Sequence, residues 1–358
     1  MTDPSGAATS ITGDAGVIDC DVQTVVPKVD ALIPYLTDHW KEYVAQSAFR
    51  GPVDTAYPKG FATTARAGTQ PPGGGPAGSD IETTCRQALA GVEFAILNNV
   101  YSVDSVHNPD SAMAMARSVN DWTATEWLPR DARLRASMTV PIQQPTIAAE
   151  EIARAGGRDR FVQVLLPART RIPLGNRVYH PIYEAATRHG LTIGIHFGGA
   201  PGNAPTGVGW PSYYIEEFAG MAQVAQSQVA SLIAEGVFER FPTLTVVFIE
   251  VGWTWVPSLM WQLDRAWRST RRTVPWVRKP PSDAIREHIR LTLTPTHAPS
   301  QSGLLAQIVE QMGTDEMLLF SSAYPREHGE DPSAILSELP RKVVRRIRSE
   351  NARATYRL

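Results

Sequence analysis

The sequence predicts an α/β fold, a (β/α)₈ TIM barrel made by a single domain, and three observations support this prediction. Eight short β-branched runs recur along the 358 residues. Most of them are separated by amphipathic stretches with apolar residues three and four positions apart, which is typical of parallel strands joined by helices. No run is followed by the glycine-rich phosphate loop of the competing open, doubly wound sheet. Eight such units in a chain of this length favour the barrel.

The expected elements follow one another in the order that a barrel requires. Strands are predicted at Val17–Gln23, Val92–Asn98, Arg133–Pro141, Arg160–Pro167, Leu191–Phe197, Leu244–Glu250, Ile289–Pro295 and Glu316–Ser322. Helical periodicity marks Pro109–Leu128, Tyr179–Gly190 with its C-cap glycine, Glu217–Phe241 and the basic, amphipathic tail Arg341–Glu350.

Two segments fall outside this alternation. Residues 1–16 are small and polar, so we expect a flexible N-terminal segment before a barrel that spans residues 17–358. Residues 48–80, after the first strand, form a Pro/Gly-rich loop far longer than a barrel connection needs. Because aromatic and apolar residues are interleaved in it, an ordered flap over the barrel mouth or a subunit contact is preferred to disorder.

The composition narrows the range of partners and compartments. Lys and Arg number 34 against 36 Asp and Glu, so the balanced charge predicts neither nucleic acid nor a membrane surface as partner. The first residues lack a signal-peptide pattern, and no apolar run reaches transmembrane length. Cys20 and Cys85 are too few for a disulfide framework, so a cytoplasmic location is expected.

Reactive groups in such a barrel lie at the C-terminal ends of strands, and the first strand is unusually polar there. Side chains alternate along a strand, so one set is expected to face the barrel: Asp19, Asp21 and Gln23. Their neighbours are expected on the opposite face: Ile18, Cys20 and Val22. Polar groups in such a row are costly to bury unless they are hydrogen-bonded or bound to an ion.

Three of these strand ends together suggest a metal site. The first strand offers Asp21, the fifth ends in His196 and the sixth in Glu250. One imidazole and two carboxylates suit a single Zn²⁺, Mn²⁺ or Fe²⁺ ion. Taken singly, His196 is equally explained as a hydrogen-bonded core histidine and Glu250 as a buried structural acid.

Several longer stretches resemble a known group of proteins. They include "IDCDVQTVVPKVDALIPYLTDHWKEYV", "IHFGGAPGNAPTGVGWPSYYIEE" and "EGVFERFPTLTVVFIEVGWTWVPSLMWQLDRAW". These segments are similar to the amidohydrolase-related proteins of the amidohydrolase superfamily, which include metal-dependent decarboxylases of the aminocarboxymuconate-semialdehyde type. The resemblance covers nearly all of the chain after residue 16. It implies a distorted (β/α)₈ barrel with a metal at its mouth, and it matches His196 and Glu250 to metal ligands.

The same resemblance exposes three departures from the family pattern. Related proteins have a metal-binding His at the position of Gln23, and a metal-binding, proton-moving Asp followed by a His where this chain has Ala323 and Arg326. A Gln amide oxygen is a poor replacement for imidazole nitrogen, and Ala323 offers no ligand. The vacated positions Gln23 and Ala323 therefore predict at most one divalent metal and make a dinuclear site unexpected.

Two hypotheses for the function follow. In the first, the chain supports an active homologous subunit with an intact metal site, as in a two-subunit 2-aminoisobutyrate hydroxylase whose active subunit resembles dinuclear Mn/Fe oxygenases. In the second, it is a stand-alone metal-dependent hydrolase or decarboxylase of a small carboxylic acid, with Arg169 or Arg326 pairing with the substrate carboxylate. The substrate of either would be a small carboxylic or amino acid. Structural ion pairs are the alternative for both arginines, and a solvated loop position is expected for His328.

Overall fold

The computed structural model describes residues 16–52, 65–158, 160–199, 204, 206–301 and 303–358. Eight parallel strands form one sheet in the order β1 to β8, with each strand hydrogen-bonded to the next along the chain. Their bounds are β1 Val17–Thr24, β2 Val92–Asn99, β3 Leu134–Thr139, β4 Phe161–Arg169, β5 Thr192–Gly199, β6 Val246–Ile249, β7 Ile289–Thr292 and β8 Leu318–Leu319. All eight predicted strands are confirmed.

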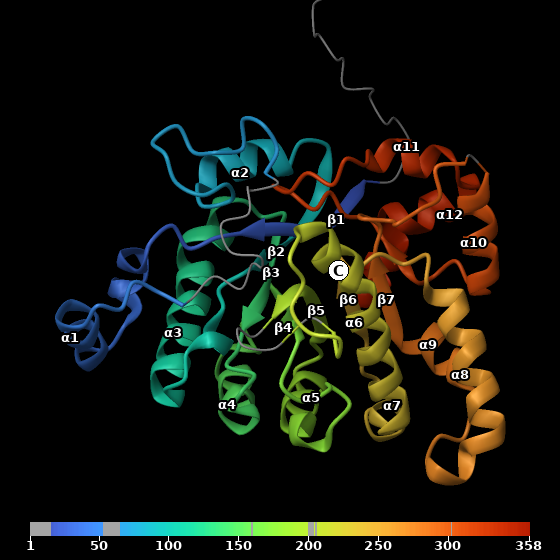
Figure 1. Ribbon diagram of the computed structural model, residues 1–358. Helices are drawn as coiled ribbons and strands as arrows, with labels where there is room; N and C mark the ends of the chain where they lie inside the picture. Colours follow the sequence, from blue (N-terminus) through green and yellow to red (C-terminus); the bar gives the residue numbers. More distant parts are fainter. Residues whose placement is uncertain (1–15, 53–64, 159, 200–203, 205, 302) are drawn as a thin grey trace, which may run out of the picture.

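Helices surround these strands (Figure 1). Their bounds are α1 Asp38–Gln46, α2 Ile81–Ala88, α3 Pro109–Trp122, α4 Pro145–Ala155, α5 His180–Arg188, α6 Tyr214–Ala234, α7 Val237–Arg240, α8 Val256–Thr270, α9 Pro281–His288, α10 Leu304–Met312, α11 Pro332–Ser337, α12 Arg341–Arg345 and α13 Asn351–Tyr356. Local signals set several ends: Asn108 caps α3 by accepting the N–H groups of Asp110 and Ser111, and Gly190 follows α5 with a φ of 68°. The predicted (β/α)₈ fold is therefore confirmed.

The ring closes through the segment after β8 rather than through β8 itself. Leu318–Leu319 is a short strand, and its parallel pairing with β7 ends at Leu319. Instead the N–H of Cys20 donates to the carbonyl of Phe320 at 2.9 Å, and that of Gln23 to Tyr324 at 2.7 Å. This closure brings the position of Ala323 next to the C-terminal end of β1.

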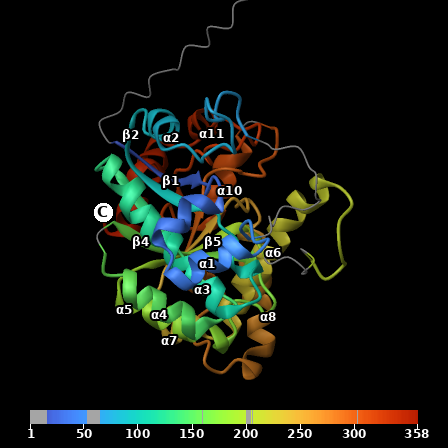
Figure 2. The ribbon, with the colours of Figure 1, turned by 90° about the vertical axis from the view of Figure 1, so that its left-hand side faces the viewer.

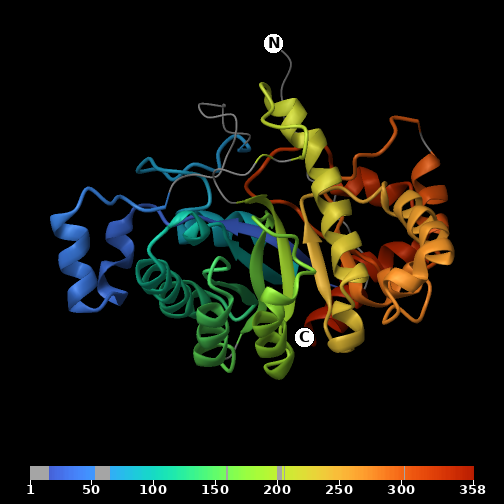
Figure 3. The same ribbon diagram turned by 60° about the horizontal axis from the view of Figure 1, so that its bottom comes forward.

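The interior of the barrel is filled by a small apolar cluster. It contains Ile18, Cys20, Ile96, Val247, Ile249, Leu319, Ala352 and Tyr356. Residues of β2 and β6, on opposite sides of the ring, meet only inside it, so this cluster marks the inner face. The last helix, α13, contributes Ala352 and Tyr356, and the C-terminus lies at the lower edge of the strands in Figure 3.

The inner position of Ile18 and Cys20 corrects the predicted alternation along β1. A register shift between Asp19 and Val22 interrupts the pairing of β1 with β2. Ile18 and Cys20 face inward, whereas Val22 packs in the outer core between sheet and helices. Asp19 instead accepts the N–H of Ser322, so only Asp21 and Gln23 of the predicted polar row reach the site described below.

Two additions extend the barrel. Helix α1 projects beside α3 on the outside of the ring (Figures 1 and 2).

Within the predicted loop 48–80, the described residues 65–80 lie against the ends of β1 and β8. The N–H of Arg66 donates to the carbonyl of Pro325, and the N–H of Val25 donates to the carbonyl of Gly78. Gly78 has a φ of 81°, and a Cβ there would stand 2.7 Å from Gln23 O. Most of the predicted N-terminal segment (residues 1–15) and part of the predicted loop (residues 53–64) lie outside the described residues.

Candidate metal centre and adjoining pocket

Three buried side chains from different strands converge at the C-terminal end of the barrel. They are Asp21 of β1, His196 of β5 and Glu250, which follows β6 directly. His196 Nε2 lies 3.9 Å from Asp21 Oδ1 and 3.4 Å from Glu250 Oε2, and all three side chains are at most 3% exposed. The structure thus brings together the three residues that the sequence suggested.

The imidazole of His196 is oriented for binding an ion. Its Nδ1 donates to the carbonyl of Phe197 at 2.7 Å, which leaves the lone pair of Nε2 directed at the two carboxylates. His196 Nε2 and Glu250 Oε2 are both buried and have no hydrogen-bond partner among the described residues. Two unsatisfied buried ligand atoms 3.4 Å apart fit the spacing of neighbouring ligands on one divalent metal ion.

Charges around the site hold Glu250 in its ionised form. Burial raises the pKa of this carboxyl, but Arg326, the hydrogen bond from His328 and the neighbouring imidazoles lower it to about 2. His328 Nε2 lies 2.7 Å from Glu250 Oε1, and Arg326 Nη1 lies 3.7 Å from Glu250 Oε2. The backbone of Glu250 is left-handed, with a φ of 58°, a conformation often found at functional sites.

Asp21 is held on the other side of the site. Asn98 Nδ2 donates to Asp21 Oδ1 at 2.9 Å, and Gln23 Nε2 lies 3.5 Å from Asp21 Oδ2. Burial and the nearby charge of Glu250 raise the pKa of Asp21 well above its usual value, and the hydrogen bond from Asn98 opposes the rise. A bound cation would supply the positive charge that stabilises the ionised form of this buried carboxyl group.

The positions that depart from the family pattern contact one another. Arg326 Nε donates to Gln23 Oε1 at 2.9 Å, and its guanidinium lies 5.5 Å from the centre of the Phe197 ring. Ala323 is fully buried and keeps a φ of 55°, a left-handed backbone that Asp adopts more readily than Ala. The predicted substrate residue Arg326 therefore lies at the site, as a cation beside Glu250.

The second predicted substrate residue, Arg169, lies elsewhere. Arg169 Nη1 is 3.2 Å from Glu217 Oε1 of α6, and both side chains are at most 3% exposed. Burial lowers the pKa of the guanidinium, while Glu217 and Asp104 raise it. The alternative of a structural ion pair, which the sequence left open for this arginine, describes its contacts.

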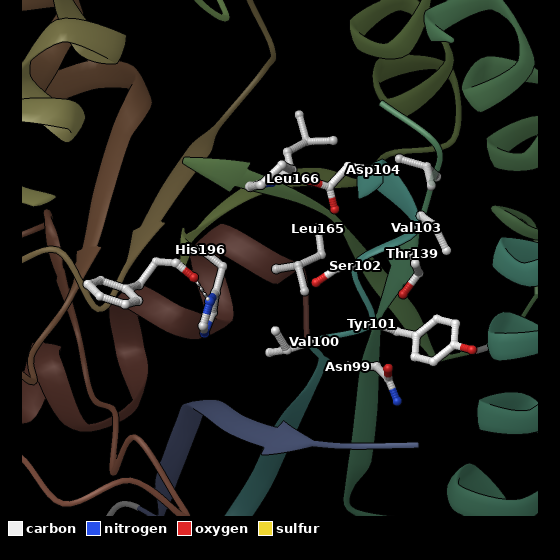
Figure 4. Close-up of a pocket in the computed structure, with 13 residues that line it drawn as sticks. Asn99, Val100, Tyr101, Ser102, Val103, Asp104, Thr139, Leu165, Leu166 and His196 are labelled. Atoms are coloured by element: carbon white, nitrogen blue, oxygen red, sulfur yellow. Dashed lines mark hydrogen bonds between the residues drawn. The ribbon is translucent and has the colours of Figure 1, made fainter. Parts of the chain in front are cut away.

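A pocket adjoins His196 on the side of β2, β3 and β4. It is a shallow hollow that opens to solvent. Its lining residues are Asn99, Val100, Tyr101, Ser102, Val103, Asp104, Thr139, Val140, Leu165, Leu166, Pro167, His196 and Phe197. Figure 4 shows His196 at one side of these residues and Asp104 and Thr139 at the other.

Sequence reasoning misplaced one residue of the site and overlooked two. His328 is not solvated: its side chain is 6% exposed and hydrogen-bonds to Glu250. Asn98 and Asp104 received no role, although Asn98 ends the second strand, where polar residues of this fold gather. Asp104 lies in a loop, and only the three-dimensional arrangement shows that it shares a pocket with His196.

Comparison with known proteins identifies the family. A family model described as amidohydrolase matches residues 21–358. The chain belongs to the amidohydrolase family. This result confirms the resemblance at the level of the family, and it agrees with the single barrel and its site at the strand ends.

The similar proteins of known activity that we compared are decarboxylases. The chain is 26% identical over 270 residues to gamma-resorcylate decarboxylase of Polaromonas sp. strain JS666, covering 71% of this chain and 81% of that protein. It is 25% identical over 290 residues to the enzyme of the same name from Rhizobium radiobacter, covering 75% and 84%.

Solved structures show the same fold at lower identity. The 2,6-dihydroxybenzoate decarboxylase from Rhizobium superimposes with a TM-score of 0.67 at 20% identity, over 96% of this chain and 98% of that one. The 5-carboxyvanillate decarboxylase from Novosphingobium aromaticivorans, in complex with manganese, gives 0.69 at 17% identity, over 96% and 97%. These structures show the fold alone, whereas the relatives of 25–26% identity agree with the decarboxylase hypothesis, and no comparison supports the hydroxylase-partner hypothesis. In the described part of the chain, no helix is long and apolar enough to cross a membrane.

Proposed function

We propose that this chain is a metal-dependent decarboxylase of a small carboxylic acid. The observation that carries the proposal is the pair of unsatisfied buried ligand atoms, His196 Nε2 and Glu250 Oε2, beside Asp21. Relatives that are 25% and 26% identical are decarboxylases, and a solved neighbour contains bound manganese. The proposal corresponds to the stand-alone enzyme of the two hypotheses drawn from the sequence.

In this proposal each residue of the site has a defined task. Asp21, His196 and Glu250 would hold one divalent metal, which would supply Lewis-acid stabilisation of negative charge on the substrate. Asn98 and Phe197 O orient the ligands, while His328 fixes the outer oxygen of Glu250. Manganese is the first metal to test, with zinc and iron as alternatives for the same ligand set.

Arg326 is the cation beside these ligands. Its guanidinium is held by Gln23 and lies over the ring of Phe197, which lines the pocket together with His196. A guanidinium can pair with a carboxylate through two parallel hydrogen bonds, which suits the group that leaves as carbon dioxide. We assign Arg326 to binding the substrate carboxylate and Arg169 to a structural role.

Loss of carbon dioxide also requires a proton at the carbon that carried the carboxylate. The resemblance implies that relatives use an Asp at the position of Ala323, whereas Ala323 has no ionisable group, so the proton would have to come from solvent water. Loss of such a general acid or base lowers rates by roughly 10²–10⁴. We therefore expect slow turnover by the wild-type chain relative to an enzyme with a carboxylate there.

The test combines metal binding with product release. The purified full-length chain is stripped of metal, titrated with Mn²⁺, Zn²⁺ or Fe²⁺, and supplied with 2,6-dihydroxybenzoate or 5-carboxyvanillate while carbon dioxide is measured. Binding of about one metal ion and metal-dependent release of carbon dioxide are expected, and both should be lost in His196→Ala. The matched control is His39→Ala, which removes an exposed histidine of α1. Equal metal content in the two variants would contradict the proposal.

Gln23 and Ala323 keep the supporting-subunit hypothesis as a second candidate, because both replace implied ligands. It predicts no turnover by the chain alone and activity only after addition of a homologous subunit with an intact metal site. Turnover by the purified chain would refute it. Co-purification from the native source, with metal analysis of each chain, would detect the expected partner.

A further inference from the structure

We propose that Asp104 forms a subsite of the pocket that binds a hydrogen-bond-donating group of the substrate, a hydroxyl or an ammonium. This inference rests on the proposed function, in which the substrate carboxylate lies at the metal centre. It adds the chemical class of the substituent at the other end of the molecule.

The first argument is the state of the Asp104 carboxylate. Asp104 lies in the short 3₁₀ turn Val103–Ser105 after β2 and lines the same pocket as His196. Its Oδ2 is buried and has no hydrogen-bond partner among the described residues. A buried carboxylate oxygen without a donor is destabilising, so its presence in a pocket calls for a ligand that supplies the donor.

The second argument concerns the other polar side chains that line the pocket and could bind a polar group of the substrate. Thr139 Oγ1 is also buried without a partner in the described chain and lies on the same side as Asp104 (Figure 4). By contrast, the polar ends of Asn99 and Tyr101 point away from His196 in this view. The remaining walls are largely apolar and suit a flat or compact hydrocarbon body: Val100, Val103, Val140, Leu165, Leu166, Pro167 and Phe197.

The third argument is the sign of the charge beside Asp104. The guanidinium that acts on Asp104 is that of Arg169, which already forms a buried ion pair with Glu217. Two carboxylates therefore share one guanidinium in this region. A carboxylate of the ligand placed beside Asp104 would be repelled, whereas a hydroxyl donor or a cation would be attracted. The substrate carboxylate accordingly belongs at the Arg326 end of the site.

The experiment measures binding rather than turnover. Dissociation constants are determined by calorimetry for the full-length, Mn²⁺-loaded chain with benzoate, the three isomers of hydroxybenzoate and the three isomers of (aminomethyl)benzoate. At least one substituted isomer is expected to bind about tenfold more tightly than benzoate, the effect of a hydrogen bond to a charged acceptor. The hydroxy and aminomethyl arms separate a neutral donor from a cation.

Variants identify the acceptor. In Asp104→Asn the advantage of that isomer over benzoate should fall below about threefold, while the affinity for benzoate stays within twofold. Asp104→Ala provides a second variant without any hydrogen-bonding group. The matched control is Glu150→Gln, which converts an exposed carboxylate of α4 into an amide and should leave every ratio unchanged.

Three outcomes overturn the subsite: no binding of benzoate or its derivatives, no isomer with an advantage over benzoate, or an advantage that survives in both Asp104 variants. The outcome is separable from that of the proposed function. An Asp104-dependent advantage without release of carbon dioxide would support the subsite and count against the decarboxylase. Release of carbon dioxide without an Asp104-dependent advantage of any isomer would support the decarboxylase and count against the subsite.

Discussion

The titration of Asp104 predicts how the stability of the protein changes with pH. Burial raises the pKa of this carboxyl from 3.8 to about 6, against the opposing charge of Arg169. The charge that acts on it is that of Arg169, which forms an ion pair with Glu217, and His196 lies across the pocket. Between pH 4 and pH 6 the folded protein therefore keeps a proton on Asp104 that the unfolded chain has released. Binding of more protons by the folded state means that stability falls as pH rises through this window.

The size of the effect follows from the shift in pKa. A rise of about 2 units corresponds to about 3 kcal/mol, which the wild-type protein loses between pH 4 and pH 7. Asp104→Asn places a neutral amide in the same space and avoids that loss. The variant should match the wild type at pH 4 and exceed it by about 3 kcal/mol at pH 7. For a chain of 358 residues this is a gain of about 4 °C in Tm.

The assay is thermal unfolding of the full-length, metal-free chain, followed by intrinsic tryptophan fluorescence at half-unit steps from pH 4 to pH 8. The quantity compared is the difference in Tm between Asp104→Asn and wild type at each pH. Glu150→Gln, an exposed carboxylate on α4, should show a difference below about 1 °C throughout. Parallel curves for wild type and Asp104→Asn would refute the reasoning, because they would mean that Asp104 is ionised at the same pH in the folded and unfolded chains.

The remaining predictions concern the metal centre and the barrel interior. The double substitution Gln23→His and Ala323→Asp should strengthen Mn²⁺ binding at least about tenfold, because it adds an imidazole and a carboxylate, and the backbone at Ala323 already has a φ suited to Asp; equilibrium dialysis that shows no gain would contradict the account of vacated ligands. His328→Gln should weaken Mn²⁺ binding by about 10- to 100-fold through loss of the hydrogen bond to a metal ligand, with unchanged Tm of the metal-free protein; unchanged affinity would remove His328 from the site. Tyr356→Phe removes the hydrogen bond from Tyr356 to Gln163 inside the barrel and should lower the free energy of unfolding by about 1–2 kcal/mol, measured by urea denaturation, without changing metal affinity; a change in metal affinity alone would show that this hydrogen bond does not serve stability.

The sequence predicted the fold well because the relevant signals are local. The spacing of apolar residues in short β-branched runs and in amphipathic stretches indicates whether a segment is a strand or a helix, and all eight strands lie where the β-branched runs occur. The last strand is much shorter than its apolar run, Glu316–Ser322, because the backbone from Phe320 onward bonds to β1 to close the ring. Such a long-range exchange of hydrogen-bond partners leaves no mark on local periodicity.

The site was predicted in part, and the division has a physical cause. Asp21, His196 and Glu250 occur at strand ends, and the geometry of a barrel brings strand ends together. The alternation argument failed for Asp19, because register shifts along β1 change which side chains face inward. His328 and Asp104 lie in loops, where neither period nor strand direction predicts the position of a side chain.

The contribution of α13 to the barrel interior has a consequence for how the protein is made. Ala352 and Tyr356 belong to the same apolar cluster as Ile18 and Cys20, so α13 supplies part of the packing on the inner face of the first strand. During synthesis the inner face of β1 therefore stays incomplete until α13 has been synthesised and has left the ribosome.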